Sequence, residues 1–258
     1  MINFKRKAHY TFEDVIAIIQ LLRSPEGCPW DQVQTHQSIR RNFLEETYEV
    51  CEAIDRDDPA SMCEELGDVL TQVVFHADIE REAGRFGLQD VYDSICTKML
   101  GRHPHIFAGG ETSGHSASSW DELKRMEKGQ TTQAETLQAV CKALPALWRA
   151  EKIQKKASNA GFLWDCAQEA LISLAHEVQT LQETTLPGPQ AKEALGDVLF
   201  AVVSVAFLCQ IDPEDALHSA CEQFVERFSR LEQSLAQKGC SVQELSKQEL
   251  TSLWNRSP

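Results

Sequence analysis

Residues 43–76 constrain the fold more than any other stretch of the chain. They carry two pairs of carboxylates, Glu46 with Glu49 and Glu65 with Asp68, and the members of each pair are three residues apart. Acids at this spacing lie on one face of a helix, one turn apart. An Asp-Arg-Asp-Asp-Pro sequence between the pairs breaks the helical pattern. We therefore predict a helical hairpin that brings the four acids together.

Four carboxylates at short range repel one another and disfavour folding, unless a cation neutralises them. The hairpin therefore predicts a divalent-metal site on a helical scaffold. Acidic helix faces are also common where the carboxylates are simply solvated, so the spacing of the acids leaves both interpretations open.

The remaining pattern favours an all-α fold, because no segment shows sustained alternation of polar and apolar residues. Helices are predicted from Thr11 to about Arg23 with Asp14 as capping-box partner, from about 35 to 56, from 59 onward behind Asp58, and to about 102 with Asp90 as the N-cap. Residues 108–119 are rich in glycine and serine and predict a flexible connector, followed by a short helix over 120–128.

Two apolar stripes are predicted to face the core of the hairpin. They comprise Leu44, Thr47, Cys51 and Ile54 on its first helix and Leu66, Val69, Val73 and Ala77 on its second. Gly67 lies in the middle of the second helix, where glycine costs about 1 kcal/mol relative to alanine. We expect a neighbouring helix or a ligand to approach closely there.

Composition limits the partners of the chain. Its 258 residues allow one large or two ordinary domains, and its net charge of −14 argues against nucleic-acid polymers and anionic membranes. Nine scattered cysteines without a Cys-x-x-Cys pair predict buried free thiols in a reducing compartment. The N-terminus lacks a signal peptide's apolar core, and the longest apolar run, 198–211, is too short to span a bilayer. We expect that run to be a buried helix and the protein to be cytoplasmic.

An internal repeat divides the chain. The Trp-Asp dipeptide at 30–31 recurs at 164–165, Leu-Gly-Asp at 66–68 recurs at 195–197, and Trp120 has a counterpart in Trp254. Repeats of this length predict two copies of one helical-bundle domain. We place the domains at 1–128 and 129–258.

The two copies differ at two of the four acidic positions. The second copy has Glu177, Thr180, Ala194 and Asp197 where the first has Glu46, Glu49, Glu65 and Asp68. Further along the second helix, Gln72 and His76 are replaced by Ala201 and Val205. Two separated acids should bind a divalent ion poorly. We therefore expect the first domain to carry an intact metal site and the second a degenerate one.

Several motifs follow one another along the first half of the chain: Cys-Pro-Trp-Asp at 28–31, Gln-Thr-His at 34–36, the acids at 45–49, Glu-Glu-Leu-Gly-Asp at 64–68 followed by Gln-Val-Val-Phe-His at 72–76, and Arg-His-Pro-His-Ile-Phe at 102–107. With these motifs, the sequence resembles the MazG family of nucleoside triphosphate pyrophosphohydrolases over nearly its whole length. In the second half, the segments at 144–147, 152–155 and 161–162 also match two-domain members. Each motif alone is a weak signal, but together and in this order they are specific.

The resemblance implies an all-α homodimer that cleaves nucleoside triphosphates to the monophosphate and pyrophosphate with Mg²⁺, as nucleotide-pool housekeeping. Mn²⁺ is an expected substitute, because both ions suit oxygen ligands. By position, the metal ligands would be Glu46, Glu49, Glu65 and Asp68. Either Glu46 or Glu49, or the neighbouring Glu45, would accept the proton of the attacking water.

The resemblance also assigns the residues that bind the substrate. Lys98 and Arg102 match the Lys-x-x-x-Arg pair that contacts phosphate in the family, and Trp30 or Trp120 would cover the base. Gln223 occupies the lysine position of the second copy, and Gly101 stands where an additional arginine is common.

The loss of acids in the second copy leaves an alternative function open. The chain would then be a non-catalytic or weakly catalytic nucleotide-binding sensor or interaction module, with the second domain serving dimerisation or regulation. A zinc site is the weaker hypothesis, because the spacing of His36, His76, His103 and His105 matches no common zinc site.

Overall fold

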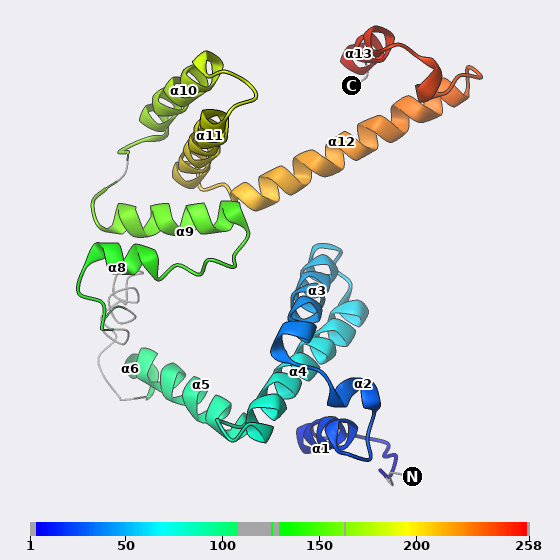
Figure 1. Ribbon diagram of the computed structural model, residues 1–258, viewed down its shortest axis with the longest axis vertical. Helices are drawn as coiled ribbons and strands as arrows, with labels where there is room; N and C mark the ends of the chain where they lie inside the picture. Colours follow the sequence, from blue (N-terminus) through cyan, green and yellow to red (C-terminus); the bar gives the residue numbers. More distant parts are fainter. Residues whose placement is uncertain (1–3, 108–124, 126–128, 163, 257–258) are drawn as a thin grey trace. The chain divides into compact units, whose positions relative to one another are not determined.

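The computed structural model describes residues 4–107, 125, 129–162 and 164–256, and these residues form helices, turns and loops without a β-strand (Figure 1). The predicted all-α fold is confirmed. The chain divides into two compact units, Met1–Ser113 and Gly114–Pro258. The connector at 108–119 and nearly all of the helix at 120–128, Trp120 included, lie outside the described residues. The exact domain boundary therefore stays a prediction.

A helical hairpin dominates the first unit. Its elements are α1 (Phe12–Arg23), α2 (Pro29–Gln32), α3 (His36–Asp55), α4 (Pro59–Glu82), α5 (Leu88–Arg102) and α6 (Pro104–Phe107). Helices α3 and α4 pack against each other along their length and form the hairpin that the sequence predicts (Figure 1).

Local capping explains where these helices begin. The Thr35 hydroxyl accepts from the backbone N–H of Ser38 at the start of α3. The Asp58 carboxylate accepts from two backbone N–H groups at the start of α4, where Pro59 needs no donor. Each interaction satisfies backbone donors that have no partner within the helix. The predicted beginnings of both helices are confirmed.

The prediction that Asp90 is the N-cap of α5 was wrong by three residues. The helix begins at Leu88, and the backbone N–H of Gly87 donates to the Asp90 carboxylate at 2.8 Å. Asp90 is therefore the capping-box partner in the first turn, while Gly87 is the N-cap residue. An acidic residue near a helix start fits either position.

The core of the first unit lies at the base of the hairpin. Ile19 of α1, Ile39 of α3, and Val74 and Phe75 of α4 form its buried centre. Towards the tip of the hairpin, no described helix covers the apolar stripes. Leu44, Thr47, Cys51 and Ile54 are therefore exposed, as is Leu66, whereas Val69 and Val73 are half-buried and only Ala77 is buried. The prediction that both stripes lie wholly in the core was wrong for this single chain.

The second unit repeats the hairpin. Its elements are α8 (Gln133–Gln138), α9 (Ala146–Asn159), α10 (Ala167–Glu183), α11 (Pro189–Leu208), α12 (Pro213–Ala236), the 3₁₀ turn η1 (Val242–Glu244) and α13 (Lys247–Arg256). Helices α10 and α11 form the hairpin, and α9 packs against both α11 and α12. The fully buried Gln154 of α9 donates from Nε2 to the carbonyl oxygen of Phe200 at 2.8 Å, which ties α9 to α11.

Two predictions about burial need correction. The apolar run 198–211 lies mostly in α11, but only one of its faces is covered: Val203 is buried, whereas Leu199 and Val202 are exposed. All nine cysteines are free, as predicted, yet Cys28 is half-buried and the other eight are exposed. These cysteines lie on surfaces that no other described element covers.

No single described helix is both long and apolar enough to cross a membrane, although α11 and α12, which are sharply bent against each other, together have the length and composition of a broken span.

Candidate metal centre

Three of the predicted acids meet on the first hairpin. Glu46 and Glu49 of α3 and Glu65 of α4 each present a carboxylate oxygen, and these oxygens lie within 4.8 Å of one another. The spacing of three residues in α3 places its two acids on one face, and the packing of α4 brings the third against them. We call these three residues the acidic trio. Asp68 follows Glu65 by one turn of α4.

The electrostatics of the trio are those of an uncompensated anionic cluster. Burial, together with the negative charges of Asp68, Glu49 and Glu65, raises the pKa of Glu46 above its ordinary value. The pKa of Glu65 is likewise raised, first by burial and then by Glu49, Glu64 and Asp68. In the described part of the chain, no lysine or arginine forms an ion pair with the trio or with Asp68.

This donor set suits a hard divalent cation. Every candidate ligand atom is a carboxylate oxygen, and a cation placed among them would remove the repulsion that raises the pKa values. Neither histidine nor cysteine belongs to the trio, so the site lacks the nitrogen and sulfur donors that zinc prefers.

Glu45 lies outside the trio. Its carboxylate is paired with Arg41 one turn earlier, at 2.7 Å from Nε. Glu52, one turn after Glu49, is similarly paired with Arg56. Both are exposed i,i+4 ion pairs of small energetic value, and they show that the neighbouring acids of α3 have cationic partners.

The predicted substrate-binding residues lie on other elements. Lys98 of α5 lines a hollow of about 570 Å³ together with Phe86 and Ile95. Arg102 is the last residue of α5, and Trp30 of α2 is 58% exposed. The three residues thus lie on α2 and α5 rather than on the hairpin α3–α4, and Trp120 lies outside the described residues.

The structure also contains a polar network at the base of the hairpin that the sequence analysis missed. The Nδ1 atoms of His36 and His76 are 2.7 Å apart, and Nε2 of His36 is 2.5 Å from Glu80. Arg85 donates to both carboxylate oxygens of Glu80, at 2.5 and 2.7 Å. Since Arg85 and His36 already occupy the Glu80 oxygens, the arrangement is an ion-pair network rather than a metal site. The sequence feature that could have predicted this network is the spacing of four residues, which places Gln72, His76 and Glu80 on one face of α4.

The contacts within this network shift the pKa values of Glu80 and His76. The hydrogen bonds from Arg85 lower the pKa of Glu80 to about 2, with His36 contributing further. Burial, reinforced by the neighbouring His36, lowers the pKa of His76. At neutral pH the network therefore contains an ionised Glu80 and favours a neutral His76.

The corresponding end of the second hairpin has no acidic trio. The hydroxyl of Thr180 donates to the backbone carbonyl of His176 at 3.1 Å, so this polar group is satisfied within its own helix. Ala194 is only 7% exposed and packs in the core. Glu177 and Asp197 remain as two acids on facing helices.

Comparison with known proteins agrees with this geometry. A profile of the MazG nucleotide pyrophosphohydrolase domain matches residues 34–107, which contain the acidic trio. The chain is 39% identical over 252 residues to the nucleoside triphosphate pyrophosphohydrolase/pyrophosphatase MazG of Thermotoga maritima, covering 98% of this chain and 97% of that protein.

Two further relatives extend the comparison. The chain is 36% identical over 249 residues to the nucleoside triphosphate pyrophosphohydrolase of Escherichia coli K12, covering 94% of this chain and 95% of the relative. It is 38% identical over 261 residues to the uncharacterized protein YabN of Bacillus subtilis, of which it covers 53%. Because two relatives match along almost their full lengths, the chain belongs to the MazG family of nucleotide pyrophosphohydrolases, which are hydrolases.

Proposed function

We propose that the first unit hydrolyses nucleoside triphosphates to the monophosphate and pyrophosphate with Mg²⁺. The observation that carries this proposal is the convergence of Glu46, Glu49 and Glu65 into a trio without a cationic partner in the described chain. Family membership and the names of two full-length relatives support the substrate class. Removal of surplus or non-standard nucleotides is the housekeeping role that we propose.

Glu46, Glu49, Glu65 and Asp68 would hold the metal ion. Bound Mg²⁺, or Mn²⁺ in its place, neutralises phosphate oxygens and lowers the pKa of a coordinated water. The oxygen-only donor set supports this choice of ion over a softer one.

The side chains of the unit supply the remaining chemistry. A carboxylate oxygen of Glu46 or Glu49, or of the adjacent Glu45, accepts the proton that the attacking water loses. Lys98 and Arg102 balance the negative charge on the phosphates, and the planar guanidinium of Arg102 suits two phosphate oxygens. The bond that breaks joins the α- and β-phosphates, so pyrophosphate leaves as one group.

Binding of the base and assembly complete the proposal. Trp30 or Trp120 would cover the base; the exposed ring of Trp30 supports the first choice. The exposed apolar side chains of Leu44, Ile54 and Leu66 support a homodimer. The net charge of −14 supports a cytoplasmic enzyme without nucleic-acid or membrane partners.

The test incubates the full-length protein with each ribo- and deoxyribonucleoside triphosphate and Mg²⁺, and measures pyrophosphate and monophosphate. The Glu49→Gln variant should lower turnover by about 100-fold or more, because a neutral amide neither holds the metal equally well nor accepts the proton. Glu52→Gln is the matched control, since it makes the same change one turn along α3 but outside the trio. It should retain turnover.

Three results would contradict the proposal. Unchanged turnover of Glu49→Gln would show that the catalytic site does not depend on the acidic trio. Orthophosphate as the first product would exclude cleavage between the α- and β-phosphates. Nucleotide binding without turnover on any substrate would favour a non-catalytic sensor.

A further inference from the structure

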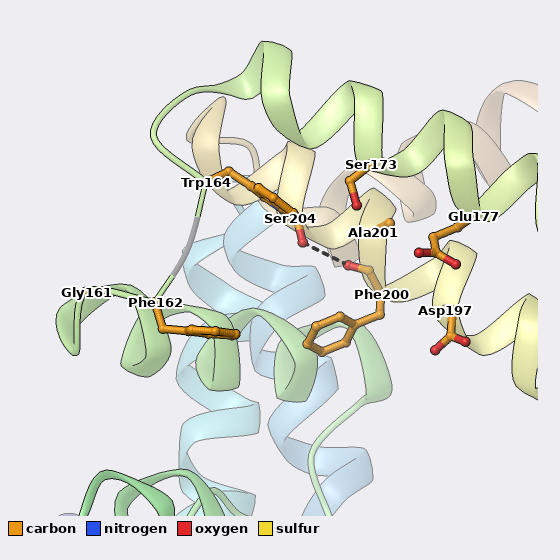
Figure 2. Close-up of a pocket in the computed structure, with 9 residues that line it drawn as sticks. All are labelled: Gly161, Phe162, Trp164, Ser173, Glu177, Asp197, Phe200, Ala201 and Ser204. Carbon is orange, nitrogen blue, oxygen red and sulfur yellow. Dashed lines mark hydrogen bonds between the residues drawn. The ribbon is translucent and has the colours of Figure 1, made fainter.

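The second unit contains a pocket of about 410 Å³ where the first unit has its acidic centre. It lies between the segment that follows α9 and the hairpin α10–α11 (Figure 2). Glu177 and Asp197, the two acids that the second hairpin retains, line this pocket. A volume of this size accommodates a small organic ligand.

Small side chains on α11 open the pocket. With Asp197 matched to Asp68, Ala201 and Ser204 occupy the positions of Gln72 and Phe75 in the first unit. In the first unit Phe75 fills the core, whereas Ser204 turns its hydroxyl back to a carbonyl oxygen of its own helix at 3.3 Å. The exchange of a phenyl ring for a hydroxymethyl group leaves space between the helices. The second unit thus has a cavity beside Glu177 and Asp197, the two acids that its hairpin retains.

Aromatic rings line one end of this cavity. Figure 2 shows Phe162 and Phe200 pointing toward one another, whereas the ring of Trp164 lies next to Ser204. Phe162 is 81% exposed, although a phenyl ring gains free energy by leaving water. A planar ligand that stacks on these rings would cover them, and base–aromatic stacking of this kind stabilises complexes.

The two carboxylates lie at the other end of the pocket (Figure 2). Asp197 forms no hydrogen bond or ion pair with any described residue, and Glu177 lies 3.6 Å from Nδ1 of the exposed His176. Ionised carboxylates only accept hydrogen bonds. The described residues that line the pocket include no lysine or arginine. The pocket therefore favours a ligand edge made of N–H donors and repels a triphosphate.

From these features we infer that the second unit binds a flat heterocycle with two adjacent N–H donors, as guanine has, without metal and without hydrolysis. The N1–H and 2-amino groups of guanine can both donate to one carboxylate, while the ring stacks on Phe162, Trp164 or Phe200. Adenine and cytosine place a ring nitrogen acceptor next to their amino group, and that acceptor would face a carboxylate oxygen. They should bind more weakly.

The test is a calorimetric titration of the full-length protein with guanosine in the absence of divalent metal, with adenosine and cytidine as comparison ligands. We expect saturable binding of guanosine and at least tenfold weaker binding of the other two. Asp197→Asn and Glu177→Gln should each weaken guanosine binding about tenfold, because a charged hydrogen-bond acceptor is lost. Asp165→Asn is the matched control, since Asp165 neighbours Trp164 but does not line the pocket. It should bind guanosine normally.

The same titration separates this site from the acidic trio. Glu49→Gln should bind guanosine as the unaltered protein does, even if its hydrolysis of nucleotides is lost. Two results would place the site in the first unit and overturn the inference. One is that Glu49→Gln loses guanosine binding, and the other is that Asp197→Asn and Glu177→Gln both bind guanosine as the unaltered protein does. No saturable binding would also overturn it. A change of oligomeric state in Phe162→Ser would instead make the pocket an interface between copies of the chain.

Discussion

The two hairpins of this protein share one scaffold and differ in chemistry. On α3–α4, three carboxylates converge within 4.8 Å. On α10–α11, the equivalent of Glu49 is Thr180, whose hydroxyl bonds to its own helix, and the equivalent of Glu65 is Ala194, which packs in the core. A helical hairpin thus folds with or without the anionic cluster. The fold of the hairpin therefore does not require the acids of the first unit, which agrees with the metal site that we propose for them.

The bases of the hairpins differ in the same direction. The first unit holds His36, His76 and Glu80 in an ion-pair network closed by Arg85. The matched positions of the second unit carry Ala167, Val205 and Cys209. Ionisation therefore contributes to the stability of the first hairpin, whereas the second depends on apolar packing.

The largest expected effect comes from giving the first hairpin the residues of the second. The double variant Glu49→Thr/Glu65→Ala should lower pyrophosphate release by about 1,000-fold or more, because two of the four proposed metal ligands and a candidate base disappear. Its metal-free thermal stability should be equal or higher, since mutual repulsion among the acids is relieved. Glu52→Thr/Glu64→Ala, which alters exposed acids on the same helices, is the control for both measurements. Full turnover in the exchanged variant would show that the two hairpins do not differ in catalysis.

The reverse exchange should disturb folding. Ala194→Glu places a carboxylate at a position that is 7% exposed, and we expect the free energy of unfolding to fall by about 2–4 kcal/mol. Urea unfolding measures this change. Ala175→Glu on the exposed surface of α10 is the matched control and should change stability by less than about 0.5 kcal/mol. If Ala194→Glu changes the free energy of unfolding as little as Ala175→Glu does, packing does not explain why position 194 lacks a carboxylate.

The next largest effect that we expect is a difference between the two hairpins in how their stability responds to acid. Arg85 and His36 hold the pKa of Glu80 at about 2, below its unfolded value of about 4.3, so its contribution is present above that value and lost towards pH 2. Burial lowers the pKa of His76, so folding disfavours its protonation and stability falls as pH drops below about 6.5. Amide hydrogen exchange should show α3–α4 losing protection at a higher pH than α10–α11.

Replacing His76 by the residue of the second unit checks the cause. His76→Val should retain α3–α4 protection to lower pH than the unaltered chain, because the variant has no imidazole to protonate. If the two hairpins lose protection at the same pH, or if His76→Val behaves like the unaltered chain, the ionisation of these groups does not distinguish the stability of the two hairpins.

Local signals predicted much of the fold, because they are complete within a few residues. Thr35 and Asp58 satisfy backbone donors of the turns that they begin, so the starts of α3 and α4 were correct. The spacing within α3 and the break before Pro59 likewise predicted that acids of two helices would meet. Asp90 misled because one capping residue fits two positions.

Burial could not be predicted in the same way, because it depends on what covers a face. The stripe through Leu44 identified an apolar side of α3, but α1 covers only the base of the hairpin. The pocket of the second unit was similarly hidden: the replacement of Gln72 by Ala201 indicated an apolar face, whereas the cavity also requires Phe162 from a segment outside the hairpin.

The smallest expected effect concerns Gly67 and Gly196, which occupy the same position in α4 and α11. A Cβ atom on either would meet no described atom within 4 Å, so the expected close approach of a neighbouring helix is not found within this chain. Replacing an exposed helical glycine by alanine stabilises by about 0.5–1 kcal/mol, and we expect both Gly67→Ala and Gly196→Ala to do so in metal-free unfolding experiments. If a nucleotide approaches the backbone beside Asp68, turnover should fall in Gly67→Ala alone. Equal turnover in both variants would show that the glycine leaves no necessary space for the substrate.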